Sequence, residues 1–340
     1  MTRIEGDWFK SRQGLCEKDG LRSSSSPNLS FVMLLSVILP AYNRAGCIAR
    51  ALESIKTQGI SELEVILGDD ASTDSTVEVA LSILPDIQVA RLTTNQGASA
   101  ARNAAIRLAK GDLLAFLDSD DEWLPDKLKH QVKFLKEHPE VGLCGSGHLL
   151  VSRHGERIPY PGKNPADWRK ELHIAESFHG ASTCVVRREV MESVGLFDER
   201  LRVLEDWDWL LRISKMHPIH VVPGQMAIIH ENNPSDADQT AQSLVYFLSK
   251  HGEEFRAFGA EHASIVISQH YENTARAFFR HKRPREGCGF LWKSWIMAPL
   301  RNPRSLAAFP LAAFDSLLGT EVLPNILADR SRRRIRPPAR

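Results

Sequence analysis

The sequence predicts an α/β fold, with a mostly parallel twisted sheet flanked by helices and a helical C-terminal extension. Between residues 34 and 117, short apolar runs alternate with segments whose apolar residues recur at helical spacing. Such runs are typical of buried strands and such segments of amphipathic helices. Their alternation predicts βαβ units, and the helical pattern from about residue 240 predicts the extension.

Each predicted element has a local reason. The first strand spans 34–39 and should end at Pro40, and the next strands span 63–67, 87–92 and 113–117. Ile48, Leu52 and Ile55 recur on one face of a helix, and Asp74 is a suitable N-cap for the next helix. A third helix spans 99–110. Farther on we expect strands at 141–144 and 183–186, and helices at 207–216 and 264–280.

These elements divide the chain into three parts. Residues 1–32 are polar and read as a disordered leader, or as an over-called start with Met33 as the initiator. Residues 33–238 form the α/β domain, and residues 239–340 a helical region that ends in a basic tail. The length of 340 residues suits one large domain with an appendage.

Bulk composition narrows the class of protein. A net charge of +1 gives no reason to expect a nucleic acid partner, and we expect no transmembrane helix because no run of 18 uncharged apolar residues occurs. The 5 cysteines are scattered without a C-x-x-C pair, which favours a reducing, cytoplasmic location.

Polar clusters follow all four early strands. They begin at Pro40, Asp69, Asn95 and Asp118. Open α/β sheets bind ligands at the carboxyl ends of their strands, so the four clusters should share one site.

The acidic cluster is the most informative of the four. Asp118 and Asp120 lie two residues apart, so their carboxylates can share one divalent cation, either Mg²⁺ or Mn²⁺. An isolated D-x-D is usually only a solvated loop. Here it follows a buried strand directly, where unscreened repulsion between carboxylates requires a counter-charge.

Other candidates have ordinary explanations of similar weight. Asp70 could bind a ribose or base, or only form a turn. Asp206 beside Trp207 could be a desolvated base, or one of several acids favoured at a helix N-terminus. His230 at the end of an apolar run could complete a metal shell, and Arg102 could approach a diphosphate or be an exposed helix residue.

The ordered motifs PAYNR, DDASTD, NQGASAARN, FLDSDDEW and LEDWDWLLR resemble those of family 2 glycosyltransferases, which have a GT-A fold. The resemblance covers about residues 34–235. It implies an inverting enzyme that takes a sugar from a nucleotide-sugar donor. A UDP-sugar is the donor expected first. The expected acceptor is a glycan or a lipid-linked molecule in cell-surface polysaccharide synthesis, such as lipopolysaccharide or exopolysaccharide.

The resemblance also implies roles for single residues. Asp206 matches the general base, and Asp118 and Asp120 match the D-x-D that holds Mn²⁺ or Mg²⁺, with His230 near the metal. The nucleotide-sugar would be bound by residues at the strand ends, namely Pro40, Tyr42, Asn43, Asp70, Arg102 and Ser119.

Departures and alternatives limit this interpretation. The chain lacks the Q-x-x-R-W motif and the transmembrane helices of processive synthases, so we expect transfer of a single sugar. A polyprenyl-phosphate sugar synthase and an inactive nucleotide-sugar-binding protein are alternatives. A signalling receiver domain would lack the additional motifs.

The region after residue 285 is expected to touch a membrane. Its apolar, aromatic stretches alternate with Lys293, Arg301 and Arg304, and residues 330–340 contain six arginines. These features predict peripheral attachment to the inner face of the membrane, or packing of the helices on the catalytic domain or on a second subunit with the arginines in solvent.

Overall fold

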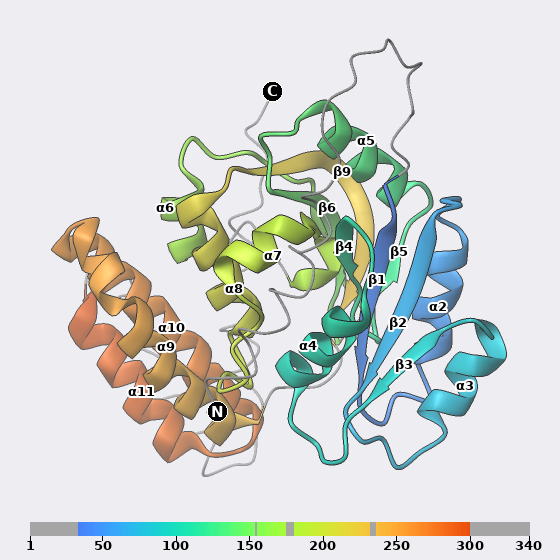
Figure 1. The fold of residues 1–340 in the computed structure, drawn as a ribbon. Helices are drawn as coiled ribbons and strands as arrows, with labels where there is room; N and C mark the ends of the chain where they lie inside the picture. Colours follow the sequence, from blue (N-terminus) through green and yellow to red (C-terminus); the bar gives the residue numbers. More distant parts are fainter. Residues whose placement is uncertain (1–32, 154, 175–179, 232–235, 300–340) are drawn as a thin grey trace, which may run out of the picture.

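The computed structural model describes residues 33–153, 155–174, 180–231 and 236–299. The proposed leader and the basic tail lie outside these residues. A single sheet runs through the centre of the molecule, with helices on both of its faces (Figure 1).

The strands follow the order β3-β2-β1-β4-β8-β6-β9-β5, and β7 pairs with β6. β1, β2, β3 and β4 are parallel, β8 is antiparallel to both β4 and β6, and β9 is parallel to β6. Their bounds are β1 Leu35–Ala41, β2 Leu63–Asp69, β3 Gln88–Arg91, β4 Leu113–Phe116, β5 Glu122–Trp123, β6 Leu143–Val151, β7 Arg157–Tyr160, β8 Val185–Arg187 and β9 Ile219–His230.

The helices lie on both faces of the sheet. Their bounds are α2 Ile48–Lys56, α3 Thr76–Ile83, α4 Ala98–Leu108, α5 Lys127–Glu137, α6 Trp168–Ile174, α7 Arg188–Val194, α8 Glu205–Met216, α9 Ala237–Ala257, α10 Ala260–Arg280 and α11 Pro284–Met297, with a short 3₁₀ turn η1 at Ala181–Thr183.

Side chains alternate between two apolar cores, as strand geometry requires. Ile38 and Phe116 point to the core shared with α4, α7 and α8, whereas Val37 and Leu39 point to the core under α2 and α5. Phe116 packs edge-on against Trp209 of α8 with ring centroids 5.2 Å apart. The apolar face of α8 therefore fixes this helix against the end of β4.

Pro40 does not end the first strand, contrary to expectation. β1 continues to Ala41 and pairs with β2 through Pro40 and Gly68. On the other side, the β4 ladder stops where Phe116 faces Ile38. Pro40 therefore lies beyond the ladder with β4, where its missing N–H costs no hydrogen bond.

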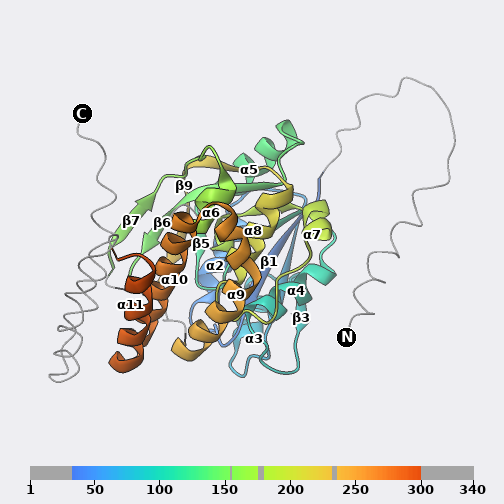
Figure 2. The same ribbon diagram turned by 90° about the vertical axis from the view of Figure 1, so that its left-hand side faces the viewer.

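The C-terminal helices pack on the α8 side of the sheet. Phe247 and Phe255 of α9 and Val266 of α10 are fully buried members of the same core as Trp209. α9, α10 and α11 form a layer beside α6 and α8 (Figures 1 and 2). α11, the described part of the region after residue 285, packs on α10, where the hydroxyls of Ser268 and Ser294 lie 2.8 Å apart. Its attachment to a membrane stays a prediction.

Candidate active site

The predicted polar clusters gather at one edge of the sheet. β9 is parallel to β6, and both are antiparallel to β8, which is itself antiparallel to β4. The carboxyl end of β9 at His230 therefore lies at the same edge as the carboxyl ends of β1, β2 and β4. The start of β8, with η1 just before it, reaches this edge as well.

Asp118 and Asp120 each face a different arginine. An Arg102 terminal nitrogen donates to Asp118 Oδ1 at 2.6 Å, and an Arg44 terminal nitrogen lies 3.7 Å from Asp120 Oδ2. Arg50 of α2 also donates to the backbone carbonyl of Asp120. These three arginines reduce the repulsion that the sequence predicts for the cluster.

Asp121, the third carboxyl, is structural. It is 4% exposed, accepts a hydrogen bond from the Ser182 hydroxyl at 2.6 Å and accepts another from the backbone N–H of His230 at 2.9 Å. Burial, and then the charge of Asp118, raises the pKa of Asp121 well above its ordinary value. This residue ties the acidic loop to η1 and to the end of β9.

Asp118 and Asp120 have the donor atoms that a hard cation prefers. Among the residues described, no three His, Cys, Asp or Glu side chains converge closely enough to hold a metal. Mg²⁺ and Mn²⁺ commonly take one or two carboxylates and complete their shell with water and substrate phosphates. The two side chains remain 28% and 22% exposed, and the bond from Arg102 to Asp118 uses only Oδ1. The pair therefore fits a cation bound together with a diphosphate.

His230 contacts the same acidic loop, since its backbone N–H donates to Asp121. Its Nε2 is 3.0 Å from Oε1 of Glu122, which is also 3.7 Å from Nε of Arg50. Its role as a metal ligand stays a prediction.

The loops after β1 and β2 support each other. Asn43 adopts a left-handed conformation with φ 51°, its backbone N–H donates to the Ser72 hydroxyl, and its side-chain oxygen accepts from the Thr73 N–H. Ser75, and not Asp74 as expected, is the N-cap of α3. Asp74 lies one residue earlier and accepts hydrogen bonds from the backbone N–H groups of Thr76 and Ala45. The loops are therefore held in a defined shape at the site edge.

The predicted nucleotide-binding residues differ in exposure. Tyr42 is 42% exposed, whereas Pro40, two residues earlier in β1, is buried. Ser119 is buried. Asp70 is also buried, and its carboxylate accepts hydrogen bonds from the Asn95 amide at 2.9 Å and from the backbone N–H groups of Gln96 and Gly97 at 2.6 and 2.7 Å. Asp70 thus shapes the loop before α4.

Arg102 is brought to the site by a close approach of α4 to β2. A Cβ on Gly68 would lie 2.2 Å from the carbonyl oxygen of Ala101, so only glycine permits this contact. Arg102 is 3% exposed, and its two terminal nitrogens donate to Asp118 and to Glu205 Oε1, the latter at 2.9 Å. It is a buried residue and not the exposed helix arginine of the alternative interpretation.

The three acids at the start of α8 have different surroundings. Glu205 accepts from Arg102, and Asp208 is fully buried among cationic side chains. Asp206 forms no ion pair within the described part of the chain, and its Oδ1 accepts only from the neighbouring Trp207 N–H. Asp206 is therefore the acid best able to accept a proton from a ligand.

The pKa values of two of these acids are shifted toward neutrality. Burial, reinforced by the charge of Asp206 and opposed by Arg102, raises the pKa of Glu205 to about 7. Burial likewise raises the pKa of Asp206, and the positive charge of Arg102 opposes that rise. A carboxyl with the pKa of Glu205 can exchange protons near physiological pH, and the raised pKa of Asp206 makes it a better proton acceptor than an ordinary aspartate.

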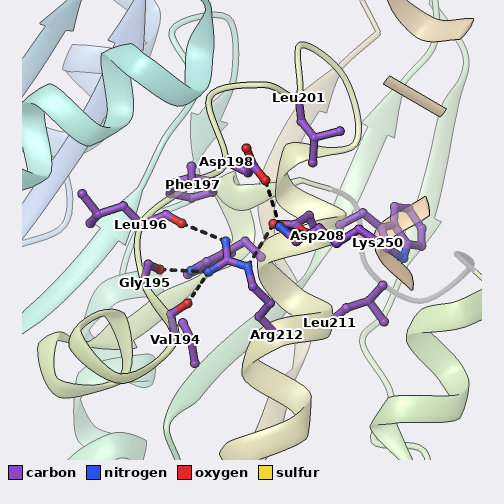
Figure 3. A network of polar contacts seen from close by, with 12 residues as sticks. Val194, Gly195, Leu196, Phe197, Asp198, Leu201, Asp208, Leu211, Arg212 and Lys250 are labelled. Carbon is purple, nitrogen blue, oxygen red and sulfur yellow. Dashed lines mark hydrogen bonds and ion pairs between the residues drawn. The ribbon is translucent and has the colours of Figure 1, made fainter. Parts of the chain in front are cut away.

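Asp208 belongs to a network that holds the C-terminal helices in place (Figure 3). It lies 2.9 Å from Nε of Arg212, 2.6 Å from Nζ of Lys250 and 2.8 Å from Nε2 of His251. Arg212 also donates to the backbone carbonyl of Val194 at the end of α7 and to those of Gly195 and Leu196 in the loop after it. The network joins α8, α9 and this loop, so we assign Asp208 to stability.

Asp208→Asn is expected to lower the free energy of unfolding by about 3 kcal/mol at pH 7, because it leaves buried cations without their counter-charge. Burial would raise the pKa of Asp208, but the His251 hydrogen bond and the charge of Arg212 outweigh it and lower this pKa to about 2. The stabilisation is thus present above about pH 4 and is lost as the pH falls toward 2.

Chemical denaturation of the wild type and the variant at pH 7 and pH 3 tests this. The matched control is Asp238→Asn, which breaks an exposed ion pair with Arg283 and should cost about 1 kcal/mol or less. Equal losses for the two variants at pH 7 would contradict a structural role for Asp208.

Several residues of the site were not predicted from sequence, among them Ser182, Arg44 and Glu205. Ser182 bridges Asp121 and the backbone N–H of Asp118, but no motif surrounds it. Arg44 and Glu205 lie inside the recognised motifs, and only their neighbours were assigned roles. Charge was the signal that could have found them, because Arg44 is opposite in charge to Asp120 and Glu205 is opposite in charge to Arg102, and both pairs lie close together in the fold.

Comparison with known proteins places the chain in context. Residues 36–194 match a family model described as Glycosyl transferase family 2. TuaG of Bacillus subtilis, named as a candidate teichuronic acid biosynthesis glycosyltransferase, is 32% identical over 183 residues, which cover 53% of this chain and 72% of TuaG. WfaP of Escherichia coli, named a UDP-Glc:alpha-D-GlcNAc-diphosphoundecaprenol beta-1,3-glucosyltransferase, is 38% identical over 105 residues, 30% of this chain and 41% of WfaP.

A solved structure has a similar fold. S. aureus TarS 1–349 in complex with UDP matches with a TM-score of 0.55 and 21% sequence identity, covering 90% of this chain and 93% of that chain.

Proposed function

The chain belongs to glycosyltransferase family 2, and we propose that it transfers a single sugar from a UDP-sugar, with inversion, to an acceptor hydroxyl. It is a glycosyltransferase, and its likeness to TarS confirms the α/β fold of the GT-A type. One observation carries the proposal furthest. Asp118 and Glu205 bind the same guanidinium, so the donor-side carboxylates and the acid pair at the start of α8 lie at one site.

The proposed reaction assigns one role to each half of this site. Asp206 takes the proton of the acceptor hydroxyl, and the hydroxyl oxygen attacks the anomeric carbon from the face opposite the nucleotide. The bond from that carbon to the diphosphate oxygen breaks, and its electron pair leaves with the diphosphate. A single displacement of this kind inverts the anomeric configuration.

Asp118 and Asp120 would hold Mn²⁺ or Mg²⁺, and His230 would lie next to it. When bound, such an ion supplies positive charge that stabilises the departing diphosphate. Tyr42, Asn43 and Pro40 would border the nucleoside, and Asp70 shapes the neighbouring loop.

The names of relatives support the donor and acceptor classes. TarS was solved with UDP, and the name of WfaP specifies a UDP-sugar donor and a lipid-diphosphate-linked acceptor. TuaG is named for the synthesis of a polymer, teichuronic acid. We therefore propose a glycan or lipid-linked acceptor in cell-surface polysaccharide synthesis.

A donor screen tests this function. Release of nucleotide would be followed with UDP-, GDP- and dTDP-sugars, each with Mn²⁺ or Mg²⁺ and with polyprenyl-phosphate or glycan acceptors. Release from a UDP-sugar that depends on a glycan-bearing acceptor is the expected result. Transfer only to a bare polyprenyl phosphate would assign the chain to the synthase alternative.

We propose that the region from α11 onward attaches the enzyme to the inner face of an anionic membrane. Trp292 and Ile296 of α11 are 48% and 56% exposed, and the exposed Lys293 lies between them in sequence. Among the described helices, none is long and apolar enough to cross a membrane. Interfacial Trp and basic side chains are typical of helices that lie on a bilayer surface.

Flotation with anionic liposomes tests the attachment. The double variant Trp292→Ser/Ile296→Ser should reduce the floated fraction several-fold at low salt, since each buried apolar side chain contributes about 1.5–3 kcal/mol. The control, Val245→Ser, changes a side chain that is 69% exposed on α9. Truncation after residue 299 measures how much the basic tail contributes to the floated fraction. Equal recovery of all four proteins in the unbound fraction at low salt would contradict attachment.

A further inference from the structure

Arg102 joins two parts of the site that are far apart in sequence. One terminal nitrogen donates to Asp118 Oδ1 at 2.6 Å, and the other donates to Glu205 Oε1 at 2.9 Å. Its guanidinium carbon lies 5.3 Å from the centroid of the Phe197 ring. The side chain is only 4% exposed, so the guanidinium is held from several sides.

This geometry leaves little of Arg102 available to a ligand. Both terminal nitrogens are engaged by carboxylates of the protein, and Nε is buried without a hydrogen-bond partner among the described residues. The interpretation from sequence, in which Arg102 contacts the nucleotide directly, would require at least one of these carboxylate bonds to be released.

We propose that Arg102 is a positioning residue that fixes the donor-side carboxylate Asp118 relative to the acid pair Glu205–Asp206. It acts through these carboxylates and does not itself touch the substrate. The inference rests on the proposed function, in which Asp118 serves the donor and Asp206 serves the acceptor.

The local backbone supports a positioning role. Leu204, the residue before α8, has a φ of 70°, which is unusual for a bulky side chain, and Glu205 and Asp206 follow it directly. A strained entry persists only where surrounding contacts determine it. The bond from Arg102 to Glu205 is one such contact, and it lies one residue before Asp206.

Arginine suits this role better than lysine. Its planar guanidinium offers separate N–H donors to two acceptors at once, whereas a lysine ammonium is a compact charge on a flexible stem. The charge of Arg102 also opposes the burial that raises the pKa of Asp206, which keeps more of this carboxyl ionised.

The test uses Arg102→Lys, Glu205→Gln and the double variant in the full-length chain. Arg102→Lys should lower kcat by about 10²-fold, because small misplacements of reacting groups have effects of that size. The dissociation constant of UDP, measured by calorimetry, should stay within about threefold. Glu205→Gln should lower kcat about tenfold. The double variant should be no worse than Arg102→Lys, because both changes break the same bond between Arg102 and Glu205.

Arg107→Lys is the matched control. Arg107 lies on the same helix, is 44% exposed and is 3.8 Å from Glu199, so this variant should behave as wild type. Thermal melts report whether each variant folds. If Arg102→Lys does not fold, Glu205→Gln decides, since it leaves Arg102 and Asp118 in place.

Several results would overturn the positioning role. A loss of UDP affinity as large as the loss of kcat would make Arg102 a nucleotide ligand. Additive losses of kcat in the double variant, or a wild-type kcat in Glu205→Gln, would show that Arg102 does not act through Glu205. Failure of the proposed function is distinct, because the wild type itself would then release no nucleotide from any donor.

Discussion

Replacing Asp120 by alanine is expected to abolish turnover, with a loss of about 10³-fold or more, because it removes one of two carboxylates available to a diphosphate-bound cation. The fold should persist. Asp120 is 22% exposed, and its partner Arg44, which is 33% exposed, can be solvated once the carboxylate is gone. Removing one of several neighbouring negative charges also relieves repulsion.

Steady-state assays with Mn²⁺ or Mg²⁺, and after EDTA treatment, measure this effect. Asp126→Asn is the control, because Asp126 lies after the same acidic loop but is 50% exposed and its carboxylate pairs with Lys129, while asparagine tolerates the left-handed φ of 65° at this position. It should retain wild-type activity. Full activity in EDTA, or in Asp120→Ala, would exclude the metal role of the D-x-D.

Asp206→Asn has the second largest expected effect, a fall in kcat of about 10²-fold or more with donor binding retained. Asparagine keeps the shape of the side chain and removes the proton acceptor. Because burial raises the pKa of Asp206, the base is protonated in acid and becomes competent as the pH rises through this raised value. The wild-type kcat should therefore increase with pH over that range, and the variant should lack this step.

The neighbouring acids provide the comparison for Asp206→Asn. Glu205→Gln should lose less, because Glu205 is held by Arg102 and would act only through its neighbour. If Asp206→Asn turns over normally and Glu205→Gln does not, Glu205 is the base. The carboxylate of Asp208 already pairs with Arg212, Lys250 and His251, so Asp208 is a poor candidate for the base.

The first half of the fold could be predicted because each strand there is a short apolar run bounded by polar residues. The four parallel strands differ from their predicted ends by only one or two residues, and α10 was found from its periodicity. The predicted boundaries of the three parts of the chain remain a prediction.

The second half was harder to predict for a physical reason. β6 spans Leu143–Val151 through Gly145 and Gly147, and β9 spans Ile219–His230 through Pro223 and Gly224. These residues disfavour strands locally. Here they permit an irregular pairing, since a Cβ on Gly147 would lie 2.3 Å from the carbonyl oxygen of Gly224. Only the tertiary partner explains them.

The site shows the same division. The strand pattern predicted Asp118 and Asp120 at one sheet edge, and the resemblance added Asp206. Spacing alone could not separate the acids proposed to serve the ligand from the structural ones. Asp121 is distinguished by its bond to Ser182, which lies 61 residues away in the sequence. Arg102 is distinguished by its bond to Glu205, which lies 103 residues away.

Calorimetric titration of UDP into the wild type, Asp120→Ala and Asp206→Asn, with and without Mn²⁺, tests the division of the site most directly because it needs no acceptor. We predict that Mn²⁺ strengthens UDP binding to the wild type and to Asp206→Asn by at least about tenfold, and that Asp120→Ala loses this gain. UDP binding that is equally strong in all three proteins with and without Mn²⁺, or absent from all of them, would contradict the account.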